Sequence, residues 1–207
     1  LHHLPEDLYK VHSPVFVERN TYYQDSLSYS TYALRTRICN SSALADVPDM
    51  AGGELYYRGG AVHNLSPLAE RGSGPTDIQP CLSDEEVYAN VLKNVCAALD
   101  KDPKLTVFSV SQNDNPTYCS CEACAAFDEA HGSPSASLMN FVNRIAEAVE
   151  ERYPDRNIKI LTLAFVSSAK PPVDIVMRDN VVVQLCTMNC CFNHAFNDPA
   201  CEKNAEF

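Results

Sequence analysis

The stretch Leu105–Cys124, LTVFSVSQNDNPTYCSCEAC, joins an apolar run to a polar run and then to three closely spaced cysteines. Its first six residues are mostly β-branched or aromatic, which predicts a buried strand over residues 105–110. In parallel α/β sheets, ligands bind at the carboxyl ends of the strands, because the loops converge there. The polar residues after this strand are therefore candidates for a functional site, and Asp114 is the first of them.

The flanking sequence predicts strands and helices in alternation. Ser83 and Glu86 have capping-box spacing, which predicts a helix that ends at Asp102-Pro103. The other predicted elements are strands over residues 14–23, 61–65, 158–166 and 181–185 and helices over residues 25–40 and 138–149. Alternation with apolar strands favours a parallel sheet with right-handed crossovers. We therefore expect one α/β domain over residues 1–207, a partial (β/α)8 TIM barrel of five to six parallel strands with flanking helices.

The length of the chain bounds this expectation. A complete (β/α)8 barrel typically needs ~250 residues, so 207 residues predict an incomplete barrel and a fragment of a longer protein. The apolar content of 45% is ordinary for a soluble globular domain. The net charge of −11 argues against a nucleic-acid partner, and no apolar run is long enough to predict a membrane span. A neutral substrate such as a sugar fits this composition better.

Seven of the ten cysteines form two groups along the chain, at residues 119–124 and 186–201. Cys119, Cys121 and Cys124 have the close spacing of a metal-binding knuckle, and a fourth ligand is expected from the group at residues 186–201 or from His194. Three interpretations remain open at this point. The cysteines bind a structural zinc ion, form disulfides between the two groups, or pack as small buried apolar residues.

Several polar residues, within the central stretch and outside it, are candidates for substrate binding. Glu18 and Arg19 interrupt an apolar run, which indicates either a structural ion pair or a substrate clamp. His63 follows two glycines and is either an ordinary core or rim residue or part of the site. The substrate-binding candidates are Glu18, Arg19, Tyr22, His63, Gln112, Asn115 and His194.

Five segments resemble a known bacterial family. They are SVSQNDN at residues 109–115, CSCEAC at 119–124, FVNRIAEAVEERYP at 141–154, NVVVQLC at 180–186 and CCFNHAF at 190–196. They are similar to domain-of-unknown-function family number 4838, which is associated with α-glucuronidase-type glycoside hydrolases. The resemblance implies a glycosidase-like TIM barrel in an exported protein, and hence an extracellular or periplasmic location.

A weaker resemblance is to hexosaminidase-like barrels. Arg19, His63 and the step Asn113-Asp114 occupy similar places in the order of elements. This resemblance implies that Asp114 is the catalytic acid and that Asn113 orients a substrate group. Those enzymes carry two adjacent carboxylates, whereas here the first residue is an amide, which cannot act as a base or nucleophile. The second carboxylate would then come from Glu18, from Glu122 or from beyond residue 207.

The sequence therefore predicts a carbohydrate-active protein. We expect a glycoside hydrolase that acts on a glycan containing N-acetylhexosamine or uronic acid, by acid/base catalysis and with no cofactor except a structural zinc ion. One alternative is a non-catalytic carbohydrate-binding or structural domain, in which Tyr22, Tyr23, Tyr118 and Phe192 stack on sugars. Another is a zinc-dependent enzyme built on the cysteine knuckle. Asp114 also has a simpler interpretation, since Asn-Asp-Asn-Pro is typical of a turn.

Overall fold

The computed structural model of the chain describes residues 23–38 and 58–205. The chain divides into two compact units, residues 1–56 and 57–207, which are described separately. In the first unit, α1 (Gln24–Ser28) and α2 (Ser30–Arg35) replace the single helix predicted over residues 25–40. The prediction is wrong because Tyr29 is extended, with φ −124° and ψ 105°, and so interrupts the helix. The predicted strand over residues 14–23 lies outside the described residues, apart from Tyr23.

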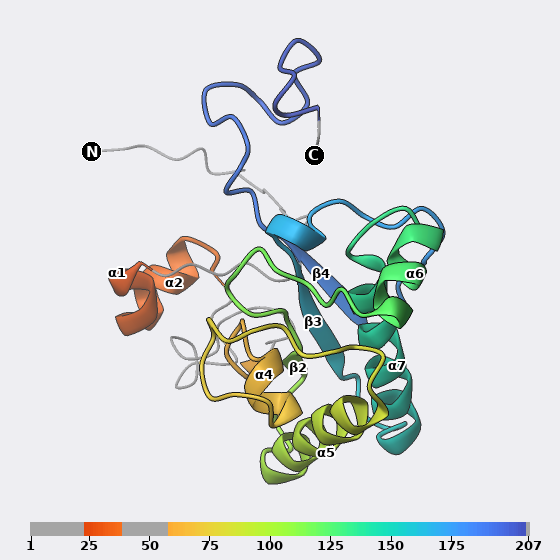
Figure 1. Cartoon of the computed structure of the whole chain (residues 1–207). Helices are drawn as coiled ribbons and strands as arrows, with labels where there is room; N and C mark the ends of the chain where they lie inside the picture. Colours follow the sequence, from red (N-terminus) through yellow and green to blue (C-terminus); the bar gives the residue numbers. More distant parts are fainter. Residues whose placement is uncertain (1–22, 39–57, 206–207) are drawn as a thin grey trace, which may run out of the picture. The chain divides into compact units, whose positions relative to one another are not determined.

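The second unit is built on a parallel sheet with the strand order β1-β2-β3-β4 (Figure 1). Its strands are β1 (Arg58–Gly59), β2 (Val107–Ser109), β3 (Lys159–Ala164) and β4 (Val181–Leu185). Among residues 23–38 and 58–205 there are no others, and β1 has only two residues. The predicted partial TIM barrel of five to six strands is therefore wrong. The described fold is a small parallel sheet with helices, in which the predicted strand over residues 181–185 is confirmed.

The predicted strand over residues 61–65 is wrong because the backbone turns there. Gly60 and His63 both have positive φ, 73° and 59°, and the chain then enters the short helix α4 (Leu65–Ala69). Asn64 nevertheless pairs with the end of β2 through its side chain. Its Nδ2 donates to the carbonyl oxygen of Ser109 at 2.7 Å, and its Oδ1 accepts from the Ser111 amide at 3.1 Å. A side-chain amide thus makes the contacts that a strand backbone would make.

Two long helices form most of the layer against the sheet. The predicted helix after Ser83 is confirmed as α5 (Glu85–Lys101), and the one predicted over residues 138–149 as α7 (Ala136–Arg152). The capping residue of α5 differs from the prediction, because Asp84 rather than Ser83 accepts from the Glu86 amide, at 2.9 Å. Between β2 and α7 lies α6 (Glu122–Ala130), and the 3-10 turn η2 (Val166–Ser168) follows β3. No helix of the described residues is long and apolar enough to cross a membrane.

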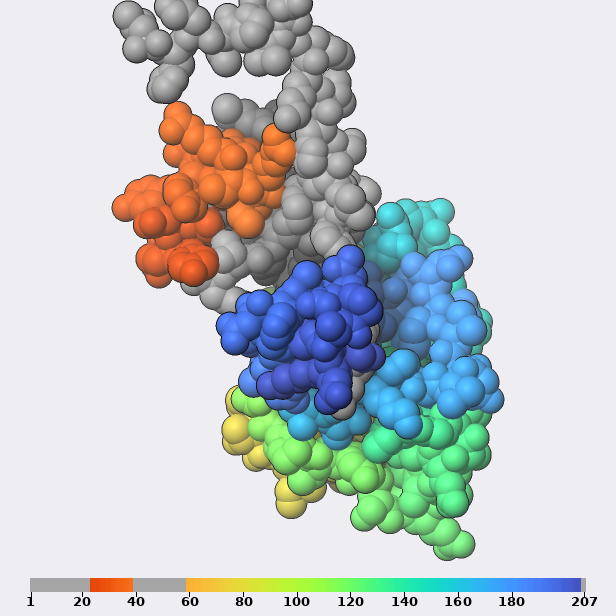
Figure 2. Space-filling view, turned by 90° about the horizontal axis from the view of Figure 1, so that it is seen from above, coloured from red at the N-terminus to blue at the C-terminus, as the bar shows by residue number. Residues whose placement is uncertain are grey.

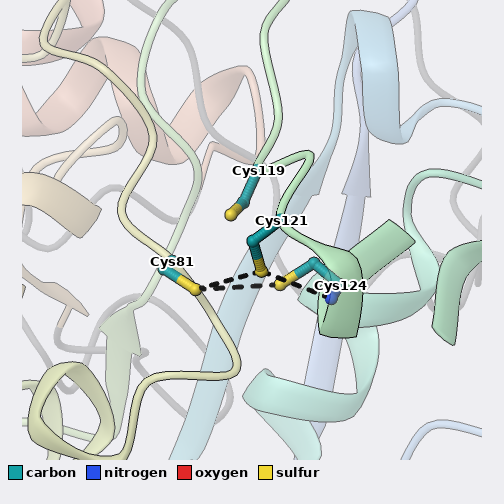
Figure 3. Close-up of side chains that lie close together, drawn as sticks. All are labelled: Cys81, Cys119, Cys121 and Cys124. Atoms are coloured by element: carbon teal, nitrogen blue, oxygen red, sulfur yellow. Dashed lines mark hydrogen bonds between the residues drawn. The ribbon is translucent and has the colours of Figure 1, made fainter. Parts of the chain in front are cut away.

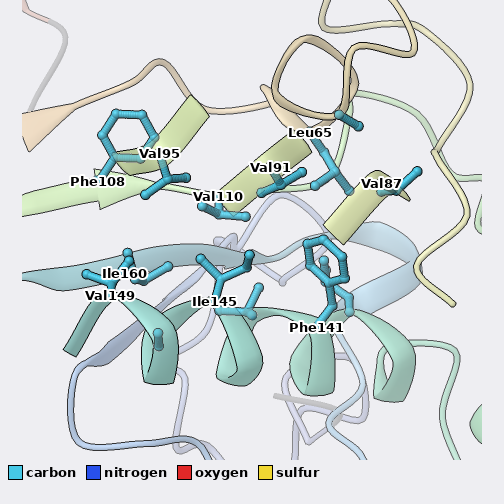
Figure 4. Close-up of a cluster of buried hydrophobic side chains, with 14 of the residues drawn as sticks. Leu65, Val87, Val91, Val95, Phe108, Val110, Phe141, Ile145, Val149 and Ile160 are labelled. Carbon is cyan, nitrogen blue, oxygen red and sulfur yellow. The ribbon is translucent and has the colours of Figure 1, made fainter. Parts of the chain in front are cut away.

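The core lies between these helices and the sheet (Figure 4). Residues four apart on each helix form one apolar stripe, as helical periodicity requires. The residues labelled in Figure 4 are Val87, Val91 and Val95 of α5, Phe141, Ile145 and Val149 of α7, Leu65 of α4, Phe108 of β2 and Val110 after it, and Ile160 of β3. All ten are buried. This packing holds the carboxyl ends of β2 and β3 in place relative to the helices.

We predict that Ile145→Ala destabilises the unit by about 2–5 kcal/mol, because the truncated side chain leaves a cavity in a dry core. Asn140→Ala is the matched control, since Asn140 lies exposed on the same helix. It should change the free energy of unfolding by no more than about 0.5 kcal/mol. Denaturant unfolding of the three proteins checks this, and equal stability of the two variants would contradict the described core.

Candidate metal centre and polar rim

Four cysteine side chains from three segments of the second unit meet at one point (Figure 3). Cys81 precedes α5, Cys119 lies in the loop after β2, Cys121 is the N-cap residue of α6 and Cys124 lies in its first turn. Their sulfur atoms all lie within 4.8 Å of one another. We call these residues the four-cysteine cluster. It is composed of thiol groups that could together hold a metal ion.

The sulfur–sulfur distances match those of a tetrahedral zinc site. Four sulfurs bound at ~2.3 Å to one zinc ion lie ~3.8 Å from one another. The Sγ atom of Cys81 lies 3.6 Å from that of Cys121 and 4.0 Å from that of Cys124. A metal of this size therefore needs little movement of the protein to enter.

The pKa values of the thiols in the cluster are shifted in opposite directions, by hydrogen bonds in one case and by burial in two. The backbone N–H of Cys124 and the hydroxyl of Ser83, both 3.5 Å away, donate to the Cys121 sulfur and lower the pKa of Cys121 to about 6. Burial raises the pKa of Cys119 to about 12 and also raises that of Cys124. Cys121 is therefore the thiolate at neutral pH, and a metal ion would have to displace protons from Cys119 and Cys124.

The cluster confirms that Cys119, Cys121 and Cys124 lie together, but its fourth member was not predicted. Cys81 takes the position that we expected His194 or a cysteine of residues 186–201 to occupy. Spacing alone does not reveal Cys81, which stands apart from both groups of cysteines in the sequence. The available signal was its place just before the helix that begins at Glu85.

The carboxyl ends of β2 and β3 form a polar rim, which consists of His63, residues 111–118 and residues 165–168. Gln112 is buried and connects the two strand ends. Its Nε2 donates to the Phe165 carbonyl oxygen at 3.1 Å, and its Oε1 accepts from the Ser168 hydroxyl. His63 Nδ1 donates to the carbonyl oxygen of Gln112 at 2.9 Å. The structure thus brings His63 and Gln112 together, and their predicted role in substrate binding stays a prediction.

Asn113 is fully buried, with its amide engaged inside the protein. Its Nδ2 donates to the carbonyl oxygens of Asp77 and Ile78, at 2.9 and 3.2 Å, and to the Ser66 hydroxyl, and its Oδ1 accepts from the Ser66 amide at 3.2 Å. A substrate could reach Asn113 only after these bonds break. Its contacts hold α4 and the loop at residues 77–78 against the end of β2, and its predicted substrate-orienting role stays a prediction.

The Asn115 side chain also makes its hydrogen bonds within the protein. Its Nδ2 donates to the Asp77 carbonyl oxygen at 2.8 Å, and its Oδ1 accepts from the Thr117 amide and from Gln79 Nε2, both at 3.1 Å. Gln79 was not predicted as a site residue. Its Oε1 accepts a hydrogen bond from the backbone N–H of Asn113 at 3.0 Å. These bonds hold the rim loop to residues 77–79.

Asp114 and Tyr118 are the exposed functional groups of this loop. The backbone N–H of Asp114 donates to the carbonyl oxygen of Pro75, whereas its carboxylate makes no hydrogen bond or ion pair with the described residues. The Tyr118 side chain is 52% exposed. A carboxylate and an aromatic ring therefore stand on one loop whose backbone is held on both sides, and the loop runs on into Cys119.

A small cavity lies between the rim and the four-cysteine cluster. Its lining includes Gln112, Tyr118, Cys119 and Asp128, and its volume is about 30 Å³. That is enough for one or two water molecules, whereas sites for organic ligands measure about 300 Å³ or more. This cavity is therefore too small to hold a sugar.

The remaining predicted residues fall elsewhere or cannot be placed. Glu18, Arg19 and Tyr22 lie outside the described residues. Glu122, a candidate second carboxylate, is exposed in the first turn of α6 beside the cluster. The Nδ1 atom of His194 lies 3.1 Å from the sulfur of Cys191. It belongs to a second group of ligand atoms, which is described below.

Comparisons with known proteins place the chain in a family without assigning it an activity. The sequence model of the family described as "Domain of unknown function (DUF4838)" matches residues 3–206, which confirms the predicted resemblance. A capsid protein of Kennedya yellow mosaic virus (strain Jervis bay) is 28% identical over 93 residues, which are 44% of this chain and 43% of the capsid protein. The match thus spans less than half of that relative. No solved structure matches the chain.

We predict that metal-free protein is alkylated at Cys121 before Cys119, because only the Cys121 pKa of about 6 leaves a thiolate at neutral pH. The rate at Cys121 should fall as the pH decreases through about 6, since protonation removes the nucleophile. Iodoacetamide labelling followed by peptide mass spectrometry measures both rates. Faster labelling of Cys119, or a rate at Cys121 that does not change between about pH 5 and pH 8, would contradict the described hydrogen bonds.

Proposed function

The chain belongs to the family of domains of unknown function DUF4838, and we propose that it is a carbohydrate-active domain whose four-cysteine cluster is a structural zinc site. The zinc would hold the loop after β2 in place. Asp114 and Tyr118 on that loop would contact the sugar.

The zinc proposal is supported by the number and the spacing of the sulfur atoms. One or two disulfides would bring the paired sulfur atoms to ~2.05 Å, well below the 3.6 and 4.0 Å that separate the Cys81 sulfur from those of Cys121 and Cys124. A zinc ion uses all four, and the sulfur–sulfur distances of 3.6 and 4.0 Å are close to the tetrahedral value. Four protein ligands fill the coordination shell, which is typical of structural and not of catalytic zinc. This argues against the zinc-dependent enzyme that we considered from the sequence.

The carbohydrate proposal rests on one observation, the exposed carboxylate and ring on the loop at residues 114–118. Sugars present hydroxyl donors to a carboxylate and apolar faces to an aromatic ring. Both groups stand at the carboxyl edge of the parallel sheet, where ligands of such sheets bind. Asn115 and the backbone N–H of Asp114 hold the loop, so little conformational entropy would be lost on binding.

Under this proposal Asp114 would act on a glycosidic bond as the general acid. It would protonate the leaving oxygen, while a second group supports the oxocarbenium-like centre or activates water. That second group stands about 5–9.5 Å from the acid in glycosidases, and Glu18 and Glu122 stay the candidates for it in this chain.

A second candidate function is carbohydrate binding without hydrolysis. The exposure of Asp114 favours it, because general acids of glycosidases are usually buried enough to keep a proton near neutral pH. In that case the carboxylate accepts hydrogen bonds from sugar hydroxyls, and Tyr118 supplies the stacking surface.

We predict that Cys81→Ser lowers the zinc content by one ion per chain, because serine oxygen replaces a thiolate ligand. The melting temperature should fall by about 5–10 °C, the effect of ~2–3 kcal/mol in a domain of this size. Elemental analysis and thermal unfolding check both effects. Cys186→Ser is the matched control, since Cys186 belongs to no group of metal-ligating atoms in the described structure. Equal zinc content in Cys81→Ser and the wild type would rule out the site.

We predict that Asp114→Asn abolishes the release of sugar from aryl glycosides or weakens retention on a glycan array at least about tenfold, because the carboxylate contacts the sugar. Asp155→Asn is the control, since Asp155 is exposed in the turn before β3. Loss of turnover with retained glycan binding supports the hydrolase, and loss of binding without any turnover in the wild type supports the binding domain. Full activity and full binding in Asp114→Asn would exclude both roles for this residue.

A further inference from the structure

The segment at residues 186–205, which follows β4, brings a second set of metal-ligating atoms together. Cys191, His194 and Cys201 place two sulfurs and one imidazole nitrogen within 4.8 Å of one another. The Sγ atom of Cys191 lies 3.1 Å from Nδ1 of His194. Their spacing, Cys-x2-His-x6-Cys, closes two short loops. No regular helix or strand is assigned within the described residues of this segment.

One buried asparagine holds this arrangement. Asn204 is 2% exposed, and its Oδ1 accepts from the Cys191 amide at 2.7 Å. Its Nδ2 lies within hydrogen-bond distance of the carbonyl oxygens of Cys191, His194 and Ala195, at 3.2, 3.2 and 3.0 Å. One side chain therefore positions the backbones of Cys191 and His194. Hydrogen-bonding partners outside the ligand shell often position metal ligands in this way.

The interior of the segment is unusual for a folded loop. Its buried residues are Cys190, Cys201 and Asn204, whereas its large apolar side chains are exposed, with Met188 at 67%, Phe192 at 79% and Phe196 at 55%. A segment that leaves its aromatic residues in water gains little from the hydrophobic effect. Small segments without an apolar core are commonly stabilised by disulfides or by a metal ion.

We propose that Cys191, His194 and Cys201 form a second metal site, which binds a zinc ion through two thiolates and one imidazole and leaves the fourth position to an exchangeable small ligand. A sulfur and a nitrogen bound to one tetrahedral zinc ion lie ~3.6 Å apart. The observed 3.1 Å requires these two atoms to separate by only about half an ångström.

The fourth position distinguishes this site from the four-cysteine cluster. Among the described residues no further cysteine, histidine or carboxylate atom joins the three ligands. Three protein ligands with an open position are typical of zinc that exchanges water for a monodentate ligand. His194 is exposed and Cys191 is half-buried, so solvent reaches the site. Figure 2 shows the end of the chain, in dark blue, at the surface of the molecule.

The contact between the Cys191 sulfur and the His194 ring nitrogen agrees with this assignment, because two ligands of one zinc ion must face each other at a similar distance. The alternative is a disulfide between Cys201 and Cys190 or Cys191, which would leave His194 without a role. The two possibilities differ in metal content and in thiol content.

The first test counts metal ions in the full chain purified with zinc and without chelator. The wild type is expected to hold two zinc ions per chain, and the double variants C191S/C201S and C81S/C121S one each. C186S should hold two, because it removes a cysteine of the same segment that belongs to neither site. One zinc ion in the wild type that C191S/C201S retains would overturn the proposal.

Thiol labelling separates the metal site from the disulfide. After denaturation with chelator and without reductant, peptides containing Cys191 and Cys201 should take up iodoacetamide completely. Labelling that occurs only after a reductant is added would show a disulfide and overturn the proposal. Because Cys81 and Cys121 are mapped in the same experiment, failure of this site and failure of the four-cysteine cluster are distinguished.

The open position is tested with cobalt(II) in the C81S/C121S variant. Addition of azide should shift the visible absorption bands of the bound cobalt, since azide replaces water. Cobalt in C191S/C201S, with four thiolate ligands, is the control and should not respond. An unchanged spectrum in C81S/C121S would show that the protein fills the fourth position and would overturn that part of the proposal.

Asn204→Ala provides a test that leaves every ligand in place. It should weaken cobalt binding at the second site by about 10- to 100-fold, the usual effect of removing an outer hydrogen-bonding partner. Affinity for the four-cysteine cluster should not change, because Asn204 contacts only residues 191–205. Unchanged affinity at the second site would show that Asn204 does not position its ligands.

Discussion

The convergence of four thiol groups is the constraint on which the rim of this domain depends. Cys81, Cys119 and the pair Cys121 and Cys124 come from three segments, and each segment also has another structural task. Cys81 precedes the helix that packs on the sheet, Cys119 ends the rim loop, and Cys121 begins α6. Fixing the four sulfurs therefore fixes the rim loop relative to the helices.

The protonation of the cluster bears on the proposed metal site. Hydrogen bonds lower the pKa of Cys121 to about 6, whereas burial raises the pKa of Cys119 to about 12, so the protein alone does not keep all four thiols ionised. A divalent cation supplies the missing positive charge and deprotonates the remaining thiols.

The elements that were predictable from the sequence are those with a long, regular pattern. The stripes of α5 and α7 and the apolar strand at residues 181–185 follow helical and strand periodicity directly. The region around His63 was not predictable in this way. The positive φ of His63 and the hydrogen bond from the Asn64 side chain to the backbone of β2 leave no periodic pattern in the sequence. The number of strands was overestimated for the same reason, since short apolar runs fit a strand or a turn equally well.

The candidate site was predictable in part. The spacing of Cys119, Cys121 and Cys124 correctly indicated one cluster, whereas the contact between His63 and Gln112 was not predicted. Two features depended on tertiary structure: Cys81 is distant in sequence, and Asn113 is polar yet fully buried by its partners in other loops. Hydrogen-bonding capacity alone does not tell whether an amide serves a ligand or the fold.

Zinc X-ray absorption spectroscopy on the C191S/C201S variant tests the central claim most directly, because only the four-cysteine cluster then remains. The structure predicts a first shell of four sulfur atoms at ~2.3 Å, with no nitrogen or oxygen ligand. A first shell that contains nitrogen or oxygen, or a variant that binds no zinc while it remains folded, would contradict the assignment of Cys81, Cys119, Cys121 and Cys124 as one structural zinc site.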